Sequence, residues 1–109
     1  VWIETLLTRP PGFVAKTFIM IAATAWLMAS HMIGVWLWAS LFVAVGAIGE
    51  LEPAVYFSLV TFTTLGYGDI TLTEQWRILG AICAVNGLLL FGFTTALLVE
   101  LMSRLREAT

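Results

Sequence analysis

Two long stretches of the chain, residues 17–49 and residues 78–99, carry no Asp, Glu, Lys or Arg. A helix needs about 20 mostly apolar residues to cross the hydrocarbon core of a bilayer. Both stretches are long enough for that. We therefore expect two membrane-spanning helices, a first over residues 13–48 and a second over residues 74–106.

The segment between these helices predicts a third, much shorter helix over residues 53–64. Glu52 and Pro53 suit a helix start, because proline is tolerated in the first turn and an acid favours the positive end of the helix dipole. The loop at residues 64–69 contains two glycines and is not expected to be helical. Within lipid, such a loop is tolerated only where protein surrounds it or where it lines a watery path. The order of span, short re-entrant helix, loop and span therefore indicates a pore.

Residues 1–12 form a separate short segment. Pro10 and Pro11 end any helix that begins upstream of them. We expect this segment to be cytoplasmic or interfacial, with Trp2 at the depth of the lipid headgroups. No internal repeat is visible, so residues 1–109 are interpreted as one pore domain.

The composition supports a membrane protein. Apolar residues make up 61% of the chain and charged residues 11%, against roughly 45–50% and about 25% in ordinary globular proteins. A soluble domain this small cannot hide that much apolar surface, whereas a bilayer accepts it. The predicted fold class is therefore an all-α membrane protein.

Charged residues are distributed unevenly along the chain. Arg9 and Lys16 precede the first span, and Arg104 and Arg106 follow the second. Between the spans the charges are mainly acidic: Glu50, Glu52, Asp69 and Glu74 against Arg77. Because positive loops stay on the cytoplasmic side, we expect both termini in the cytoplasm. The chain has no strongly basic face, so nucleic acid is not an expected partner.

The loop residues fit the coordination of a dehydrated cation. A potassium ion must exchange its water shell for protein oxygens, and rings of backbone carbonyls supply them if successive C=O groups point at one axis. Glycine permits the backbone conformations that this requires, and Gly66 and Gly68 stand at alternate positions. The expected ligands are the carbonyls of Thr64, Leu65, Gly66 and Tyr67, with the Thr64 hydroxyl at the inner end.

The sequence Thr-Leu-Gly-Tyr-Gly-Asp at residues 64–69 resembles the potassium-channel signature, with Leu65 in place of valine. The whole chain looks most like bacterial potassium channels with two transmembrane helices per subunit. The resemblance implies a homotetramer in the inner (plasma) membrane that conducts K⁺ passively and selectively. It implies that residues 64–69 are the selectivity filter, with ion binding at residues 64–68. It also implies that residues 53–64 are the pore helix and that there is no cofactor apart from the permeant K⁺.

Four residues are expected to support the filter: Tyr56, Val60, Thr63 and Asp69. In relatives an acid within the pore helix often pairs with the filter aspartate, but here that position holds Val60. The resemblance suggests that Tyr56 hydrogen-bonds Asp69 instead. We therefore predict that inactivation at the filter depends only weakly on pH.

The second long helix contains candidate gate residues. By the resemblance, Gly87 is either a gating hinge or a site of close helix packing, whereas packing is favoured for Gly92. Residues at spacings of three and four share one helix face, and the resemblance turns that face toward the cavity and the gate. The face consists of Leu88, Phe91, Thr95, Ala96, Val99 and Glu100, and Phe91 is also expected to support the filter from beneath.

Two titratable residues have two interpretations each. Glu100 belongs either to a ring of four carboxylates at the inner mouth, or it extends to the cytoplasmic interface or pairs with Arg104. Extension or pairing is favoured over the ring. His31 is either a pH sensor in contact with Glu100 or a neutral histidine bonded to a carbonyl or hydroxyl group. The neutral histidine is the favoured interpretation.

Several other functions compete with selective potassium conduction. A weakly selective cation channel would share the architecture, but Tyr67 argues against it. A potassium transporter subunit usually repeats the unit four times with one glycine per loop, unlike the single copy here. A non-conducting assembly protein remains a third class. His31 and Cys83 lie in different spans with no acid–base partner evident, so an enzyme is not expected.

Overall fold

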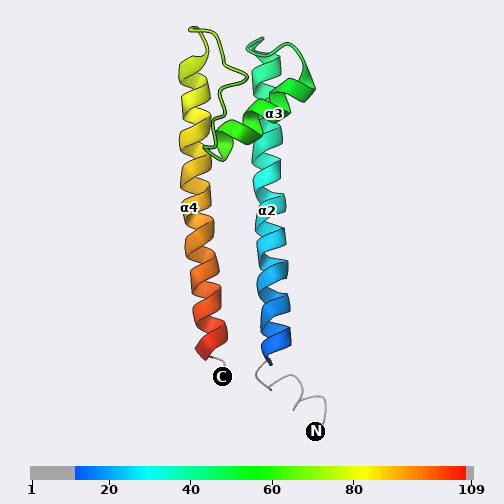
Figure 1. The fold of residues 1–109 in the computed structure, drawn as a ribbon, viewed down its shortest axis with the longest axis vertical. Coiled ribbons are helices and arrows are strands. Elements are labelled where there is room, and N and C mark those ends of the chain that lie inside the picture. Colours follow the sequence, from blue (N-terminus) through cyan, green and yellow to red (C-terminus); the bar gives the residue numbers. More distant parts are fainter. Residues whose placement is uncertain (1–11, 108–109) are drawn as a thin grey trace.

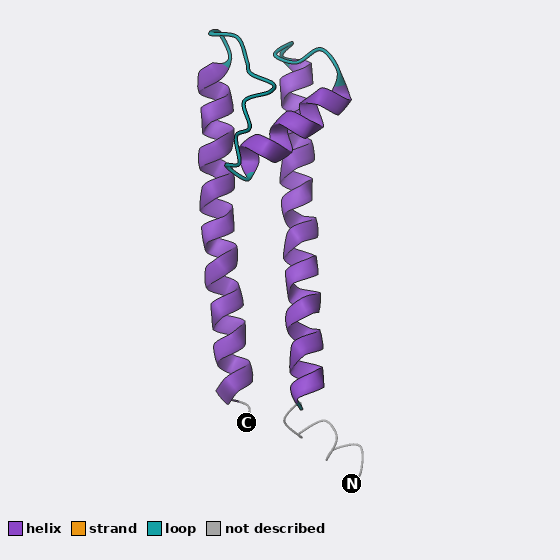
Figure 2. Cartoon of the chain, in the orientation of Figure 1, coloured by secondary structure: helices purple, strands orange, loops and turns teal. Residues whose placement is uncertain are grey.

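The computed structural model describes residues 12–107, and these form three helices joined by loops (Figure 2). The helices are α2 (Phe13–Ala44), α3 (Leu51–Phe62) and α4 (Arg77–Glu107). The prediction for residues 1–12 falls almost entirely outside the described residues.

The two long helices run side by side, and α3 lies obliquely between them near one end (Figure 1). After α3 the chain runs beside α4 as an irregular loop, and it reaches the end of the molecule where α4 begins (Figure 1). The start of α2 and the end of α4 lie together at the opposite end of the molecule. The fold is therefore a helical hairpin whose connection folds back between its arms.

Both α2 and α4 are long and apolar enough to cross a membrane. Almost none of either helix is buried within the chain, and large apolar side chains such as Trp26, Leu37 and Leu89 are exposed. An exposed apolar helix surface is stable in lipid and not in water. The chain is therefore a membrane protein, as its composition predicts.

The first helix ends at Ala44, short of the predicted end at residue 48. The helix stops there because Gly46 adopts a left-handed conformation with φ +82°. The N–H of Gly46 donates to Val43 O and the N–H of Ala47 donates to Phe42 O, which is the Schellman pattern that closes a helix C-terminus.

The short helix is shifted from its predicted range of 53–64. It starts at Leu51, so that Pro53 occupies the first turn, where a missing N–H leaves no helical bond unmade. It ends at Phe62 because Thr64 has a φ of +63°, which no α-helix accommodates.

The last helix begins at Arg77, after the predicted start at residue 74, and ends at Glu107. Residues 74–76 form a turn in which the N–H of Trp76 donates to Thr73 O. The N–H of Gly80 then donates to Trp76 O in the helical pattern. The difference is a single tight turn ahead of the helix, which the sequence pattern does not separate from the helix itself.

The core lies where α3 crosses the two long helices. It is made of Val35, Ala39 and Phe42 from α2, Ala54 and Phe62 from α3, and Cys83 from α4, with Ile48 at its edge. Phe42 and Phe62 are fully buried. Because this core includes Ala54 and Phe62, it holds α3 against both long helices.

Candidate functional site

The loop after α3 has a backbone of alternating handedness. Thr64, Gly66 and Gly68 have φ values of +63°, +60° and +80°, whereas Leu65 and Tyr67 between them do not have positive φ. The two glycines accept this conformation at low cost. We call residues 64–69 the glycine segment.

The hydrogen bonds of the glycine segment show which way its backbone faces. The N–H of Thr64 donates to Thr61 O at 2.9 Å, and the N–H of Gly66 donates to Val60 O at 3.2 Å. Alternating handedness gathers successive N–H groups on one side of a chain, and the C=O groups are left on the other. Here the N–H groups of Thr64 and Gly66 both face the end of α3.

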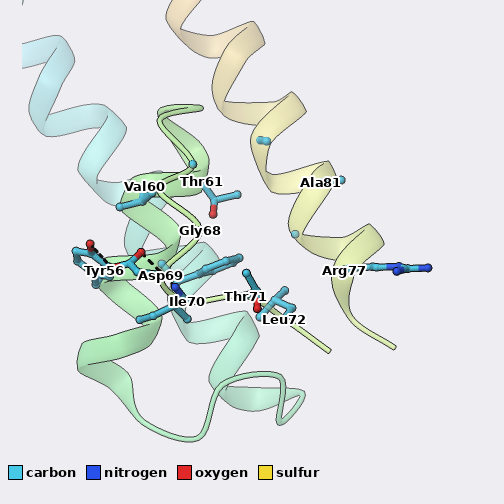
Figure 3. Close-up of a pocket in the computed structure, with 14 residues that line it drawn as sticks. Tyr56, Val60, Thr61, Gly68, Asp69, Ile70, Thr71, Leu72, Arg77 and Ala81 are labelled. Carbon is cyan, nitrogen blue, oxygen red and sulfur yellow. Dashed lines mark hydrogen bonds between the residues drawn. The ribbon is translucent and has the colours of Figure 1, made fainter. Parts of the chain in front are cut away.

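The glycine segment is anchored at its far end by a side-chain contact. Tyr56 Oη donates to Asp69 Oδ2 at 2.7 Å, and the N–H of Ile70 donates to Asp69 Oδ1 at 3.2 Å (Figure 3). The predicted bond between Tyr56 and Asp69 is therefore present. The hydrogen bond to the Asp69 carboxylate raises the pKa of the Tyr56 hydroxyl above its ordinary value.

The other predicted support residues lie at the end of α3. Val60 is buried, and its carbonyl is the group that accepts the N–H of Gly66. The Thr63 hydroxyl donates to Leu59 O at 2.8 Å, which satisfies a carbonyl in the last turn of the helix. Thr63 therefore acts on the helix end rather than directly on the segment.

A pocket of about 410 Å³ lies behind the glycine segment. One wall carries Tyr56 and Asp69, and α4 contributes Arg77 and Ala81 to another (Figure 3). Gly66 and Gly68 line the pocket from the loop side. No group of three His, Cys, Asp or Glu side chains that could hold a metal ion occurs among residues 12–107.

Gly87 is packed tightly against the end of α3. A Cβ at this position would overlap the backbone of Phe62. On the other side, a Cβ at Gly34 of α2 would come 3.2 Å from the Phe62 ring. The packing interpretation of Gly87 therefore holds in this structure. Packing was also favoured for Gly92, but a Cβ added there would meet nothing within 4 Å in the described part of the chain.

Phe91 does not share the exposed face of α4. Its ring lies 4.3 Å from that of His31 and 5.9 Å from that of Phe62, measured between centroids. Phe91 is half-buried in these contacts, and its assignment to the cavity face stays a prediction.

The other predicted cavity and gate residues are all exposed within the chain: Leu88, Thr95, Ala96, Val99 and Glu100. The Thr95 hydroxyl donates to Phe91 O at 2.9 Å. Glu100 Oε1 accepts a bond of 2.9 Å from Arg104 Nε. The structure thus contains the ion pair, one of the two arrangements favoured for Glu100 over the ring.

His31 contacts a hydroxyl group rather than Glu100. Its Nε2 lies 2.6 Å from Thr94 Oγ1 on α4. A second hydrogen bond between the long helices, from Trp38 Nε1 to Asn86 Oδ1 at 3.0 Å, was not predicted. A lone Asn inside an apolar span is a signal that could have found it, because polar groups within a membrane seek partners on neighbouring helices.

Comparison with known proteins matches the chain to one protein family. A family model described as "Ion channel" matches residues 15–104. The chain is 36% identical over 57 residues to the potassium voltage-gated channel protein Shal of Drosophila melanogaster. It is 34% identical over 57 residues to the A-type voltage-gated potassium channel KCND3 of Homo sapiens and of Rattus norvegicus.

These matches cover 51% of this chain, but only 10% of Shal and 9% of KCND3. The chain therefore corresponds to a small part of these relatives. No solved structure matches it.

Proposed function

Because the chain belongs to the ion channel family, we propose that it is the subunit of a potassium-selective channel, in which the glycine segment is the selectivity filter and α3 is the pore helix. The observation that carries this proposal is the alternating handedness at Thr64, Gly66 and Gly68. The similarity of 57 residues to potassium channels supports the choice of ion.

The chemistry of the proposed filter is the replacement of water by main-chain oxygens. The carbonyls of Thr64, Leu65, Gly66 and Tyr67 would form successive rings, and the Thr64 hydroxyl would add a ring at the inner end. A K⁺ ion entering these rings exchanges its hydration shell for carbonyl dipoles. Conduction is passive, and K⁺ is the permeant ligand rather than a cofactor.

A homotetramer is part of this proposal. One glycine segment offers oxygens from one side only and cannot surround an ion, whereas four copies around a closed rotation axis can. Within a single subunit Leu65 is 58% exposed and Tyr67 is 68% exposed. Apolar and aromatic side chains exposed to that extent, on a loop at membrane depth, fit burial by neighbouring subunits.

The direction of α3 favours a cation in the pore. Glu52 lies in the first turn of α3, and the carbonyl end of the helix leads into the glycine segment. A helix C-terminus carries about half a negative charge, and four such ends would converge beneath the filter. The re-entrant α3 would thus lower the energy of K⁺ in the middle of the membrane.

The orientation in the membrane is also proposed. Lys16 lies at the start of α2, and Arg104 and Arg106 lie in the last turns of α4, at the same end of the hairpin. Because positive residues stay on the cytoplasmic side, both termini would face the cytoplasm and the filter would open to the outside.

The test is reconstitution of the purified protein into liposomes and planar bilayers. We expect a tetramer in detergent, single-channel currents that barium blocks, and a bi-ionic reversal potential set by K⁺ over Na⁺. In Gly66→Ala the new Cβ meets a backbone with φ +60°, so selective current should be lost. Gly49→Ala is the matched control, since its Cβ meets nothing within 4 Å, and it should conduct normally.

Three results would contradict the proposal. Equal permeability of Na⁺ and K⁺ would make the protein a weakly selective cation channel. Absence of any flux from correctly folded protein would indicate a non-conducting subunit. A monomer in the membrane would exclude the fourfold filter.

A further inference from the structure

The two halves of α4 are held in different ways. Its buried residues are Gly80, Cys83 and Gly87, and all of them lie in the half beside α3. Between Leu88 and Glu107 no residue of α4 is buried within the subunit. This distal half of α4 (residues 88–107), which would line the inner part of the pore, therefore depends on a few particular contacts for its position.

One polar contact joins the distal half of α4 to α2. His31 Nε2 lies 2.6 Å from Thr94 Oγ1, about two turns beyond Gly87. The hydrogen bond between Trp38 and Asn86, by contrast, lies at the level of the core. The His31–Thr94 bond is therefore placed beyond Gly87, the last buried residue of α4.

The direction of this hydrogen bond follows from the hydroxyl group. The Thr94 hydroxyl has one proton, and it donates that proton to Leu90 O at 2.8 Å. Toward His31 the Thr94 oxygen can then only accept, so His31 Nε2 must carry a hydrogen and donate it. The bond is a specific pairing of one donor with one acceptor, and each side chain is replaceable by a near-isostere that lacks the group.

The imidazole ring of His31 also packs against aromatic rings at this level. Its centroid lies 4.3 Å from that of Phe91 and 6.2 Å from that of Phe62. Phe91 belongs to α4, and Phe62 is the last residue of α3. His31, which belongs to α2, thus lies beside α4 and the end of α3 at one level.

We propose that His31 is a positioning residue, which holds the distal half of α4 against α2 and thereby sets the balance between the open and closed states of the pore. This inference rests on the proposed function, since it assumes that residues 88–107 line the conduction path. A movement of the distal half of α4 relative to α2 has to break the His31–Thr94 bond. The bond therefore belongs to one of the two states and stabilises it.

The expected effect is moderate for one subunit and large for four. Hydrogen bonds between membrane helices shift equilibria by about threefold on average. If the four subunits move in one concerted transition, the open-to-closed ratio should change by up to about eightyfold, because the factors multiply. The effect is on gating and leaves the filter unchanged.

The experiment is a double-mutant cycle on the reconstituted tetramer in planar bilayers at constant pH. His31→Phe keeps a ring of similar size but removes the donor, and Thr94→Val keeps the shape but removes the acceptor. Both single variants should change the open probability in the same direction. The double variant should change it no more than either single variant, because both break the same bond.

Rescue by conservative variants separates this role from a merely structural one. His31→Gln and Thr94→Ser keep a donor and an acceptor and should restore the open probability toward the original value. Ser30→Ala is the matched control, because the Ser30 hydroxyl donates to Trp26 O within its own helix. It should gate like the unchanged protein.

The inference is overturned if the open probability is the same in all variants, or if the two single effects add fully in the double variant. Unitary conductance and K⁺ over Na⁺ selectivity are measured in the same recordings and should stay constant. If the unchanged protein showed no unitary conductance or no K⁺ over Na⁺ selectivity, the proposed function itself would be contradicted. Failure of this inference can therefore be told apart from failure of the proposed function.

Discussion

Gly87 of α4 lies directly against the main chain of Phe62, the last residue of α3, with no room for a side chain between them. The contact joins the second long helix to the residue that ends α3, just ahead of the glycine segment. Small residues allow membrane helices to approach this closely. The position of the segment therefore depends on a glycine far from it in the sequence.

Gly87→Ala should destabilise the subunit. The added methyl group has to displace the backbone of α3, and overpacking of this kind costs about 1–3 kcal/mol. We expect a lower midpoint of thermal unfolding, measured by circular dichroism in detergent. Gly92→Ala, in the same helix, meets nothing within 4 Å in the subunit and serves as the control. Equal midpoints for both variants would contradict the packing of Gly87 against Phe62.

Tyr56→Phe should loosen the outer end of the glycine segment. The variant removes the donor to Asp69 and keeps the aromatic ring. Loss of a hydrogen bond to a charged group weakens the local structure, although solvent moderates the effect where the pair is exposed, as here. We expect faster decay of potassium currents during long openings. Unchanged decay kinetics would mean that the bond does not support the segment.

The same bond predicts a dependence of stability on alkaline pH. The pKa of Tyr56 is raised above its ordinary value of 10.0 in the folded state, chiefly by the hydrogen bond to Asp69. The stabilising contribution is therefore complete below the unfolded-state pKa and is lost as pH rises through the folded-state pKa. The measurement is the thermal unfolding midpoint of the protein in detergent between about pH 8 and pH 12. In Tyr56→Phe the loss of stability at alkaline pH should be smaller. If the unfolding midpoint depended on pH in the same way in both proteins, Tyr56 would not be its cause.

Acid should have little effect on current decay in the unchanged protein. Val60 is buried, and it lines the same pocket as Asp69. Val60→Glu would place a second carboxyl group in that pocket, and two neighbouring carboxyl groups cannot both ionise easily. We therefore expect acid-dependent decay to appear in Val60→Glu, as measured in current traces at several pH values. Strong acid-dependent decay in the unchanged protein that Asp69→Asn abolishes would refute this prediction.

Glu100→Gln should change stability very little. The ion pair with Arg104 is exposed, with 62% of the Glu100 side chain and 75% of the Arg104 side chain accessible. Such pairs at i, i+4 contribute about 0.3–0.5 kcal/mol. The unfolding midpoint in detergent should shift only slightly, and the unitary conductance at low salt should stay constant. A marked fall in conductance would favour the alternative, a ring of carboxylates at the inner mouth.

The sequence predicted the helices better than their ends. Two stretches free of Asp, Glu, Lys and Arg were enough to locate α2 and α4, because few other structures accept so long an apolar run. The ends depend on single backbone conformations. The left-handed φ of Gly46 ends α2 and that of Thr64 ends α3, and a β-branched threonine gives no warning of such a conformation.

The part of the candidate site formed by residues close together in the sequence could be predicted. The two glycines and the Tyr56–Asp69 pair lie near one another in the sequence. The contact of Phe91 with His31 was not predicted, because helical spacing groups residues on one face without showing which edge of the face is packed. The partner of His31 was left open between two kinds of group, since the choice of Thr94 depends on how α2 and α4 are placed relative to each other.

Thr64 holds a conformation that a β-branched residue avoids, with φ at +63°, and left-handed backbone of this kind costs roughly 1–2 kcal/mol for a residue with a side chain. Glycine would relax that strain and so make the isolated subunit more stable, but it would also remove the only hydroxyl oxygen of the proposed ligand set. At this position the needs of folding and of ion coordination therefore oppose each other, and stability selection alone would replace the threonine.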